Sequence, residues 1–375
     1  MKNKAYKWVK HIIKSNIMSN NNASRQVVIG KQYIDSGLFL ISPLSDFIFQ
    51  FSHKKITTQI SYADVVVQFL NYVSTRQNLE INNLTEQDAI DFLNSCDANS
   101  TTKNTYANKL EKFYLFLIER KMLSNNVFVS FKGKYNSNSN KQTMDVIHSI
   151  KNEYLPLFIS TAIEDVPEIA LGVFLGCFGG LRNSEIVSIE YDDISYQYNQ
   201  NALVSIIINL HDKDLRPELE YAFLSKVKKN RKQEIIPAFG DLLQRLLDKQ
   251  ERVYKSEKTN ALFVDEKGLP MTAKTYSKKF GKLKRHFIKR LEQSDSFEAQ
   301  TYAMYLQSYN WSTHICRGIF SNIVASTTNN IGEIALWRGD SSMTSALTYL
   351  NNKEQVGEDV QTIMNHLLKG DALDG

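Results

Sequence analysis

The chain has 375 residues, of which 42% are hydrophobic and 11% aromatic. This length is too great for one typical core and predicts two domains, and the composition excludes a disordered chain. The net charge of +5 permits a polyanionic partner without requiring one. Cys96, Cys177 and Cys316 lack paired spacing, which argues against a zinc site or a disulfide framework and indicates a reducing compartment.

The N-terminal segment mixes lysines with apolar side chains around Trp8. Lys10, His11 and Lys14 interrupt the unbroken apolar core that a signal peptide needs. No apolar run in the chain approaches the ~20 residues of a membrane span. We therefore expect a basic amphipathic arm or helix within an N-terminal extension at 1–54, and a cytoplasmic protein without a membrane partner.

Three helices are predicted in the next part of the chain. Apolar residues recur at helical spacing from residue 62 to residue 73. Thr85 with Asp88 three residues later has the pattern of a capping box, which opens a second helix. A third helix runs over about 101–120. Three amphipathic helices in about 65 residues predict a small helical bundle, which we place at 55–131.

Lysines on and after the third helix are candidates for contacts with a phosphate backbone. They stand on the side of the helix opposite its apolar face, and at the start of an Asn- and Ser-rich linker at 132–145. A solvated helix face explains the same pattern equally well. The candidates for these phosphate contacts are Lys103, Lys109, Lys112, Lys132 and Lys134.

The second domain, at 146–375, contains a turn that favours anion binding. Helices are predicted at about 147–163 and 167–178, the second ends at Gly179-Gly180, and a further helix starts within the next five residues. Arg182 therefore lies beside a helix N-terminus, where its side chain and main-chain amides can face one anion. Glu185, one turn later, is placed to orient Arg182 or a neighbouring side chain. The alternative is an ordinary helix corner with a surface arginine.

Strand patterns at 203–208, 221–224 and 234–236 predict a small sheet in this mostly helical domain. The segment 225–232 is rich in lysine. It is either a solvated turn or a finger that presents a lysine to a ligand.

Two more helices are predicted at about 240–254 and 273–291. The second has the densest basic surface of the chain. So much charge of one sign is more favourable against a polyanion than in isolation, although a solvated face remains the alternative. Lys282 and Arg285 are the candidates from this helix for contact with a polyanion.

His314 and Arg317 lie three residues apart and so share one face of a predicted helix. Arginine offers a rigid fork of donors and histidine one more, which suits a single anion. Tyr349 follows on a later segment, spaced to return to the same point. A phosphate between such groups and a tyrosine hydroxyl is the arrangement of covalent phosphoryl transfer, to which Arg182 and a hairpin lysine would add.

Taken in order, these residues resemble the tyrosine recombinase (phage integrase) family. The matching stretches are Gly179-Gly180-Leu181-Arg182-Asn183-Ser184-Glu185, Ile235-Ile236-Pro237, His314-Ile315-Cys316-Arg317, and Gly339-Asp340-Ser341-Ser342 with Tyr349 nine residues past Asp340. The resemblance covers roughly residues 55–355. It implies a mainly α fold with a small β-sheet or hairpin, in which a SAM-like helical core-binding domain precedes a mixed α+β catalytic domain.

The resemblance also implies a role for each matched residue. Tyr349 would attack a DNA phosphate and leave a 3′-phosphotyrosyl enzyme and a 5′-hydroxyl. Arg182 and Arg317 would hold the non-bridging oxygens, and Glu185 would support the Arg182 site. His314 would hydrogen-bond the phosphate and help to accept the tyrosine proton.

A hairpin lysine would protonate the leaving oxygen. Counting back from Pro237, this lysine is Lys229 or Lys228, with Lys229 preferred, and Lys226 fits less well. No cofactor or metal is expected, because the arginines lower the cost of forming phenolate beside the phosphate. The implied partners are double-stranded DNA with inverted-repeat sites and three further copies of the chain in a tetramer.

Asp340 departs from the family, which usually has His or Trp at this position. An anionic acceptor pointing at a phosphate is costly, so we expect Asp340 to bond to Arg338, His314 or an arginine of the site. Trp337 would then fill the volume. The alternative is a decayed motif in a slow or inactive enzyme.

We therefore predict a site-specific recombinase or integrase, encoded by a bacterium, phage or mobile element, that integrates, excises or resolves DNA. One alternative with the same chemistry is a type IB topoisomerase-like or hairpin-forming resolvase. Another is an architectural DNA-binding protein with a lapsed active site. Apolar residues between 356 and 368 predict a C-terminal helix that either closes its own core or docks on a neighbouring subunit.

Overall fold

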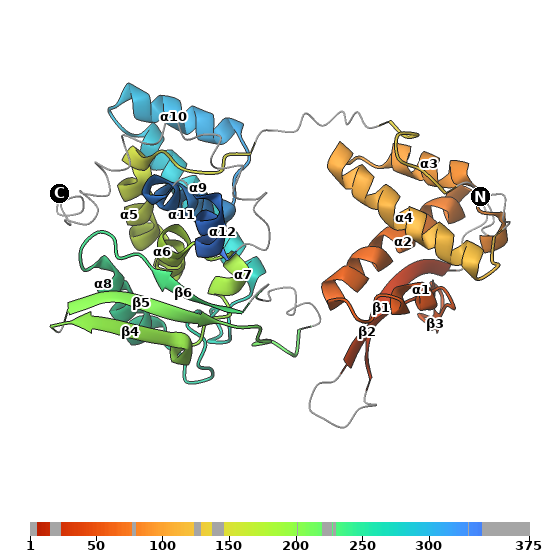
Figure 1. Cartoon of the computed structure of the whole chain (residues 1–375), viewed down its shortest axis with the longest axis horizontal. Coiled ribbons are helices and arrows are strands. Elements are labelled where there is room, and N and C mark those ends of the chain that lie inside the picture. The colour runs from red at the N-terminus through yellow and green to blue at the C-terminus, as the bar shows by residue number, and fades with distance from the viewer. Residues whose placement is uncertain are drawn as a thin grey trace. The chain divides into compact units, whose positions relative to one another are not determined.

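The computed structural model describes residues 6–15, 24–76, 80–123, 129–136, 146–200, 202–219, 227, 230–328 and 330–339. The chain divides into two compact units, residues 1–143 and 144–375 (Figure 1). The division falls inside the segment predicted as a linker. Helices predominate among the described residues of both units, and each unit also contains a three-stranded antiparallel sheet.

The first unit begins with a sheet and continues as a helical bundle. Its elements are β1 (Tyr6–Ser15), β2 (Ser24–Tyr33), β3 (Phe39–Ile41), α1 (Ser45–Phe49), α2 (Ile56–Arg76), η1 (Ile81–Asn83), α3 (Glu86–Ser95) and α4 (Ser100–Glu119). The strand order is β1-β2-β3. The predicted helices at 62–73, after Thr85 and at 101–120 correspond to α2, α3 and α4, and the capping box between Thr85 and Asp88 is formed.

The N-terminal segment is a β-strand where we expected an arm or helix. In β1 the side chain of Trp8 is buried, and its main chain exchanges hydrogen bonds of 2.9 and 2.8 Å with the Asn71 side chain on α2. Lys10 lies two residues further and pairs with Asp64 of the same helix. A lysine on the inward face hides the alternation of apolar and polar residues by which a strand is recognised.

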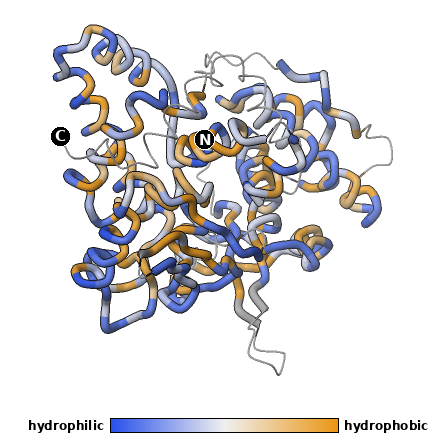
Figure 2. The backbone as a smooth tube through the Cα atoms, turned by 60° about the vertical axis from the view of Figure 1, so that its left-hand side comes forward, coloured by the Kyte–Doolittle hydropathy of each residue, from blue (hydrophilic) through white to orange (hydrophobic). Residues whose placement is uncertain are grey.

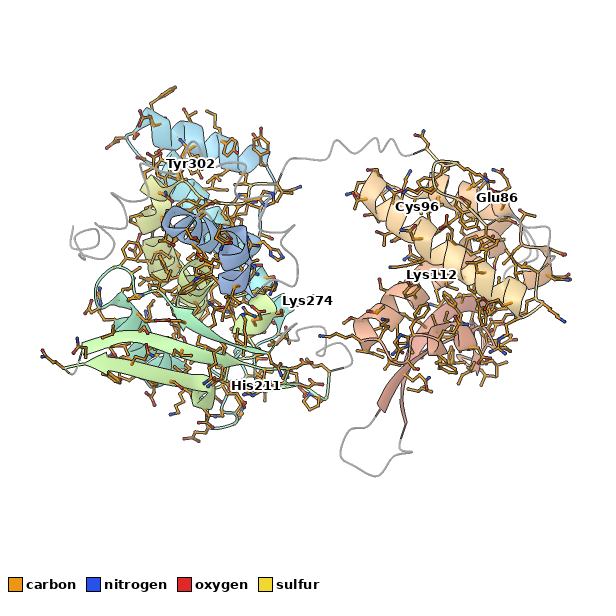
Figure 3. All side chains as sticks on the ribbon, viewed as in Figure 1. Glu86, Cys96, Lys112, His211, Lys274 and Tyr302 are labelled. Atoms are coloured by element: carbon orange, nitrogen blue, oxygen red, sulfur yellow. The ribbon has the colours of Figure 1, made fainter. Side chains whose placement is uncertain are left out.

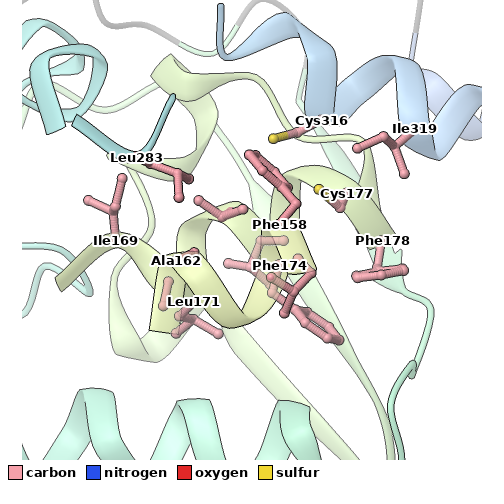
Figure 4. Packing of buried hydrophobic residues seen from close by; sticks show 14 of the residues in the cluster. Phe158, Ala162, Ile169, Leu171, Phe174, Cys177, Phe178, Leu283, Cys316 and Ile319 are labelled. Atoms are coloured by element: carbon pink, nitrogen blue, oxygen red, sulfur yellow. The ribbon is translucent and has the colours of Figure 1, made fainter. Parts of the chain in front are cut away.

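The second unit surrounds a buried helix. Its helices and strands are η2 (Asn152–Tyr154), α5 (Leu155–Asp165), η3 (Pro167–Ile169), α6 (Ala170–Gly179), α7 (Asn183–Ile186), η4 (Tyr191–Asp193), β4 (Ile194–Asn199), β5 (Ala202–Leu210), β6 (Arg231–Ile235), α8 (Leu242–Lys249), the π-helical turn η6 (Gln250–Tyr254), α9 (Ala273–Glu292), α10 (Phe297–Ser308), α11 (His314–Thr327) and α12 (Ile331–Arg338). Every residue of α6 is buried, and α5, α8, α11 and β6 contact it. Figure 4 shows side chains of α5, α6 and α11 meeting in this core.

Strand β4 and helix α10 of the second unit have no counterpart in the sequence predictions. In β4, Ile194, Tyr196 and Tyr198 alternate with polar residues, but only Ile194 is buried and the five residues after it are exposed. The predicted strand at 221–224 lies outside the described residues. The predicted strand at 234–236 begins earlier, at Arg231.

Most helices are amphipathic, and in Figure 2 hydrophobic and hydrophilic stretches alternate along them. Within the described part of the chain, we find no helix with the length and apolar character needed to cross a bilayer.

Candidate active site

The site is built on the reversal between α6 and α7. Gly180 ends α6 in the left-handed region with φ of 63°, and a Cβ there would lie 2.3 Å from the Phe320 ring. Only glycine tolerates both conditions. The chain therefore turns sharply, and Arg182 becomes the residue that precedes the first turn of α7.

Arg182 and Glu185 form the contact that we expected. The main-chain N–H of Arg182 donates to Oε2 of Glu185 at 2.9 Å, and Nη1 of Arg182 donates to Oε1 at 2.9 Å. The Glu185 side chain has 0% exposure, while that of Arg182 has 15%. Glu185 thus holds both the main chain and the side chain of Arg182.

Arg231 binds the same carboxylate, and the sequence did not identify it as a site residue. Its Nη1 and Nη2 donate to the two oxygens of Glu185 at 2.9 and 3.0 Å. Arg231 is 46 residues from Glu185 and is one of several cations in the predicted hairpin segment. No local pattern distinguishes it, because its role depends on how β6 approaches α7.

The carboxylate of Glu185 is charged in this environment. Burial raises its pKa, but the hydrogen bonds and charge of Arg231, followed by those of Arg182, outweigh burial and lower the pKa to about 2. Two guanidinium charges and one carboxylate charge leave one net positive charge on these three side chains. The charges of these three side chains therefore favour an anion nearby.

Arg317 donates to two main-chain carbonyls. It is 3% exposed on α11, its Nη1 donates to the carbonyl of Gly180, and its Nη2 donates to the carbonyl of Arg338 at 2.7 Å. These carbonyls stand at the C-terminal ends of α6 and α12, where the helix dipole is negative. The contact with Gly180 brings α11 to the turn that carries Arg182. His314, the first residue of α11, is exposed.

The C-terminal end of α12 also contacts residues of the site. Nη1 of the buried Arg338 donates to Oγ of Ser321 at 2.6 Å, while its carbonyl accepts from Arg317. Gly339 follows in the left-handed region with φ of 62°. A Cβ on Gly339 would lie 2.4 Å from Nε of Arg231, so the main chain contacts that guanidinium directly.

Four predicted catalytic residues, Tyr349, Asp340, Lys228 and Lys229, lie outside the described residues. Their roles therefore stay predictions.

The lysines of the first unit are mostly engaged within that unit. Lys103, which we expected on the outer face of α4, is buried, and its Nζ donates to the carbonyl of Asn136 at 3.1 Å. Its long stem lies in the interior while the ammonium reaches an acceptor at the edge, which a sequence pattern does not reveal.

The other candidates of this unit differ in exposure. Lys109 donates to the hydroxyl and carbonyl of Ser61, and its pKa is lowered by burial although Asp64 opposes this. Lys112 donates to the Tyr62 hydroxyl. The two remaining lysines, at 132 and 134, are exposed, and the second pairs with an acidic side chain of α3.

Helix α9 carries a row of cations that form no ion pair with any described residue. The row is exposed, follows one face at spacings of four, four, three and four, and consists of Lys274, Lys278, Lys282, Arg285 and Lys289. By contrast, Lys279 and Arg290 pair with acidic residues of neighbouring segments, and Lys284 lies over the Trp311 ring. We call the five exposed residues the α9 stripe.

The α9 stripe begins next to the turn that carries Arg182. Nδ2 of Asn183, the first residue of α7, donates to Oγ of Ser277 on α9 at 3.0 Å. Lys274 accordingly lies beside α7 (Figure 3). In the described residues no three His, Cys, Asp or Glu side chains are grouped so that they could hold a metal ion.

No protein-family model matches this sequence, and no curated protein matches it. Solved structures do. The integrase of the Tn1549 transposon in complex with circular intermediate DNA is 16% identical with a TM-score of 0.57, and the match covers 82% of this chain and 94% of that one. The XerH site-specific recombinase, bound to palindromic difH substrate, is 16% identical with a TM-score of 0.56, over 86% of this chain and 84% of that one.

A third match is the lambda integrase dimer bound to a COC′ core site, which is 13% identical with a TM-score of 0.51, over 82% of this chain and 93% of that one. At such identities the likeness establishes the fold. The fold predicted from the sequence, mainly helical with small antiparallel sheets, is confirmed.

Proposed function

We propose that this chain, which has the fold of the tyrosine recombinases, is a DNA strand-exchange enzyme that cleaves and rejoins DNA through Tyr349. The observation that carries the proposal is the meeting of Arg317 with the Gly180 carbonyl, 137 residues away, beside Arg182. Two arginines whose orientations are set before a ligand arrives suit the stabilisation of a phosphoryl-transfer transition state.

The two arginines would contribute in different ways. Arg317 donates to two main-chain carbonyls, which orient its guanidinium. Arg182 shares a carboxylate with Arg231, and the three side chains together keep one positive charge. Both would bind non-bridging oxygens of the scissile phosphate and stabilise the additional negative charge of the transition state.

In the proposed reaction the Tyr349 oxygen attacks phosphorus and the bond to the 5′-oxygen breaks. The phenol proton passes towards His314, and the leaving oxygen takes a proton from Lys229 or Lys228. The product is a 3′-phosphotyrosyl enzyme and a 5′-hydroxyl. Attack by a second 5′-hydroxyl reverses these steps, so rejoining needs neither ATP nor a metal.

DNA would lie along the α9 stripe, which starts beside the Arg182 turn and extends for roughly 22 Å at 1.5 Å per residue. Exposed cations of the first unit, such as Lys112, Lys132 and Lys134, would add phosphate contacts. We further propose recombination sites with inverted repeats and assembly of a tetramer on them.

Asp340 favours a second candidate function, because a carboxylate replaces the donor that this family usually places there. That candidate is a DNA-binding protein with a lapsed active site. A resolvase or type IB topoisomerase-like activity would use the same chemistry with a different outcome.

The test is covalent capture on nicked duplex DNA from the sequence flanking the gene, analysed on a denaturing gel. We expect an adduct with the unaltered protein and none with Tyr349→Phe. Tyr305→Phe, which alters a half-exposed tyrosine of α10, is the matched control and retains the adduct. Tight binding without an adduct would favour the lapsed site, and an adduct that survives Tyr349→Phe would identify a different nucleophile.

A further inference from the structure

Arg231 contacts Glu185, which holds Arg182, and the end of α12, which holds Arg317. It is the first residue of β6, where it is paired with Leu210 of β5. Its two terminal nitrogens donate to Glu185, which holds Arg182, and its Nε donates to Oε1 of the buried Gln233 at 3.1 Å.

The other contact of Arg231 is with the end of α12. The main chain of Gly339 lies so close that a Cβ would be 2.4 Å from Nε and 2.8 Å from Cζ of Arg231. The residue before it, Arg338, supplies the carbonyl that accepts from Arg317 at 2.7 Å. The guanidinium of Arg231 therefore lies between the Glu185 carboxylate, which holds Arg182, and the end of α12, which holds Arg317.

We propose that Arg231 is a positioning residue that holds the Glu185 carboxylate and thereby sets both the orientation and the charge of the Arg182 anion site. This inference rests on the proposed function, since it assigns Arg231 to the machinery that would hold the scissile phosphate. The side-chain contacts of Arg231 with described residues are with Glu185, Gln233 and the end of α12, and through the first and last of these it would act on the site.

The argument from orientation starts at the carboxylate. Glu185 accepts four hydrogen bonds, two from Arg182 and two from Arg231. Arg231 takes both oxygens with its two terminal nitrogens, which is the strong bidentate geometry of a guanidinium and a carboxylate. Without Arg231 the carboxylate can rotate to take a second side-chain donor of Arg182, which draws that guanidinium away from an incoming phosphate.

The argument from charge leads to the same conclusion. Glu185 has 0% exposure and Arg231 10%, so their charges are little screened by solvent. A pair of Arg182 and Glu185 alone is neutral. Arg231 adds one positive charge to that pair, which favours an anion at Arg182 before any covalent step.

The experiment measures phosphate binding directly and needs no DNA. Inorganic phosphate is titrated into full-length protein carrying [15N]arginine, and the Nε–Hε signal of Arg182, assigned by its loss in Arg182→Lys, is followed. We expect Arg231→Met to weaken phosphate binding roughly tenfold, which corresponds to about 1.4 kcal/mol.

Arg245→Met is the matched control, because it removes the same charge from an exposed arginine of α8 that pairs with Asp241. It should change the dissociation constant for phosphate less than about twofold. Equal weakening in Arg231→Met and Arg245→Met would overturn the inference, as would phosphate binding unaffected by Arg231→Met. An Arg182 signal that does not respond to phosphate in the unaltered protein would overturn it too.

Arg231→Lys provides a variant in case Arg231→Met fails to fold. Lysine keeps the charge but cannot offer two parallel donors, so an intermediate loss of roughly threefold is expected. Full retention of phosphate affinity in this variant would overturn the argument from orientation and leave only the argument from charge.

The covalent capture assay separates this inference from the proposed function. Weaker phosphate binding in Arg231→Met, together with no DNA adduct for the unaltered protein, supports the positioning role and contradicts strand exchange. An adduct formed equally fast by the unaltered protein and by Arg231→Met contradicts the positioning role and supports strand exchange.

Discussion

The arginines near Glu185 and the cations of the α9 stripe belong to one unit and carry charge of the same sign, but they are held in opposite ways. Arg317 is 3% exposed and bound to two carbonyls, and Arg182 shares a fully buried carboxylate with Arg231. The five residues of the stripe are exposed and form no ion pair with a described residue.

This difference separates two tasks of a cation near a phosphate. Burying a charge is costly unless hydrogen bonds compensate it, and the compensation also sets its orientation. An exposed lysine has little desolvation cost and no set orientation, so it attracts a polyanion without selecting a geometry. The buried set suits transition-state stabilisation and the stripe suits retention of DNA.

The largest effect is expected from Arg317→Lys. One ammonium cannot hold the carbonyls of Gly180 and Arg338 in a planar fork and also bind a phosphate oxygen, so the rate of adduct formation should fall roughly 10³-fold. The affinity for the same DNA should change less than about threefold. Single-turnover capture and gel-shift titration measure the two quantities. A comparable loss in both would mean that Arg317 acts in DNA binding and not in the chemical step.

The next effect concerns stability. In Glu185→Gln the two arginines lose the carboxylate that they share, and the free energy of unfolding at pH 7 should fall by about 3 kcal/mol in urea titrations. Glu251→Gln, which alters an exposed partner of Lys255, is the control and should cost less than about 1 kcal/mol.

The same variant has a defined pH dependence. The folded-state pKa of Glu185 is lowered from 4.5 to about 2, so its stabilisation is complete above pH 4.5 and is lost as the pH falls towards 2. The difference in unfolding free energy between the unaltered protein and Glu185→Gln should shrink over that range. A difference that stays constant down to pH 2 would contradict a charged Glu185.

A smaller effect is expected from Gly339→Ala, which tests the contact with Arg231. Both the left-handed backbone and the close guanidinium oppose a Cβ there, and we expect a loss of roughly 2 kcal/mol of unfolding free energy. Gly37→Ala is the control, because Gly37 has φ of 67° and no atom lies within 4 Å of the place that a Cβ would occupy. It should lose about 1 kcal/mol, and equal losses at both positions would argue against the Arg231 contact.

The smallest effect is expected in the α9 stripe. Lys282→Gln should lower the slope of DNA affinity against salt by about 0.9 and leave the unfolding free energy unchanged. Lys279→Gln, on the same helix but paired with Glu168, should change the slope less. Gel shifts between roughly 50 and 200 mM salt resolve the two. Equal slopes for both variants would contradict the expectation that unpaired cations contribute more than paired ones to DNA binding.

The sequence predicted the elements whose determinants are local. Helices α2, α3 and α4 follow from apolar spacing and from the capping box at Thr85, and the turn at Gly180 follows from paired glycines. The contact between Arg182 and Glu185 spans three residues and could also be predicted. The N-terminal strand could not, because Lys10 reaches Asp64 across the inward face and hides the strand pattern.

What the sequence by itself determined is therefore the order of the helices, the glycine turn and the types of residue that an anion site needs. Only the tertiary structure decided that Lys103 is buried, that Arg231 shares the carboxylate of Glu185, and that Arg317 binds the carbonyl of Gly180. The physical reason is distance along the chain. Residues one helical turn apart are neighbours in any helix. Partners 46 or 137 residues apart meet only where the packing of α6, α11, α12 and β6 brings them together.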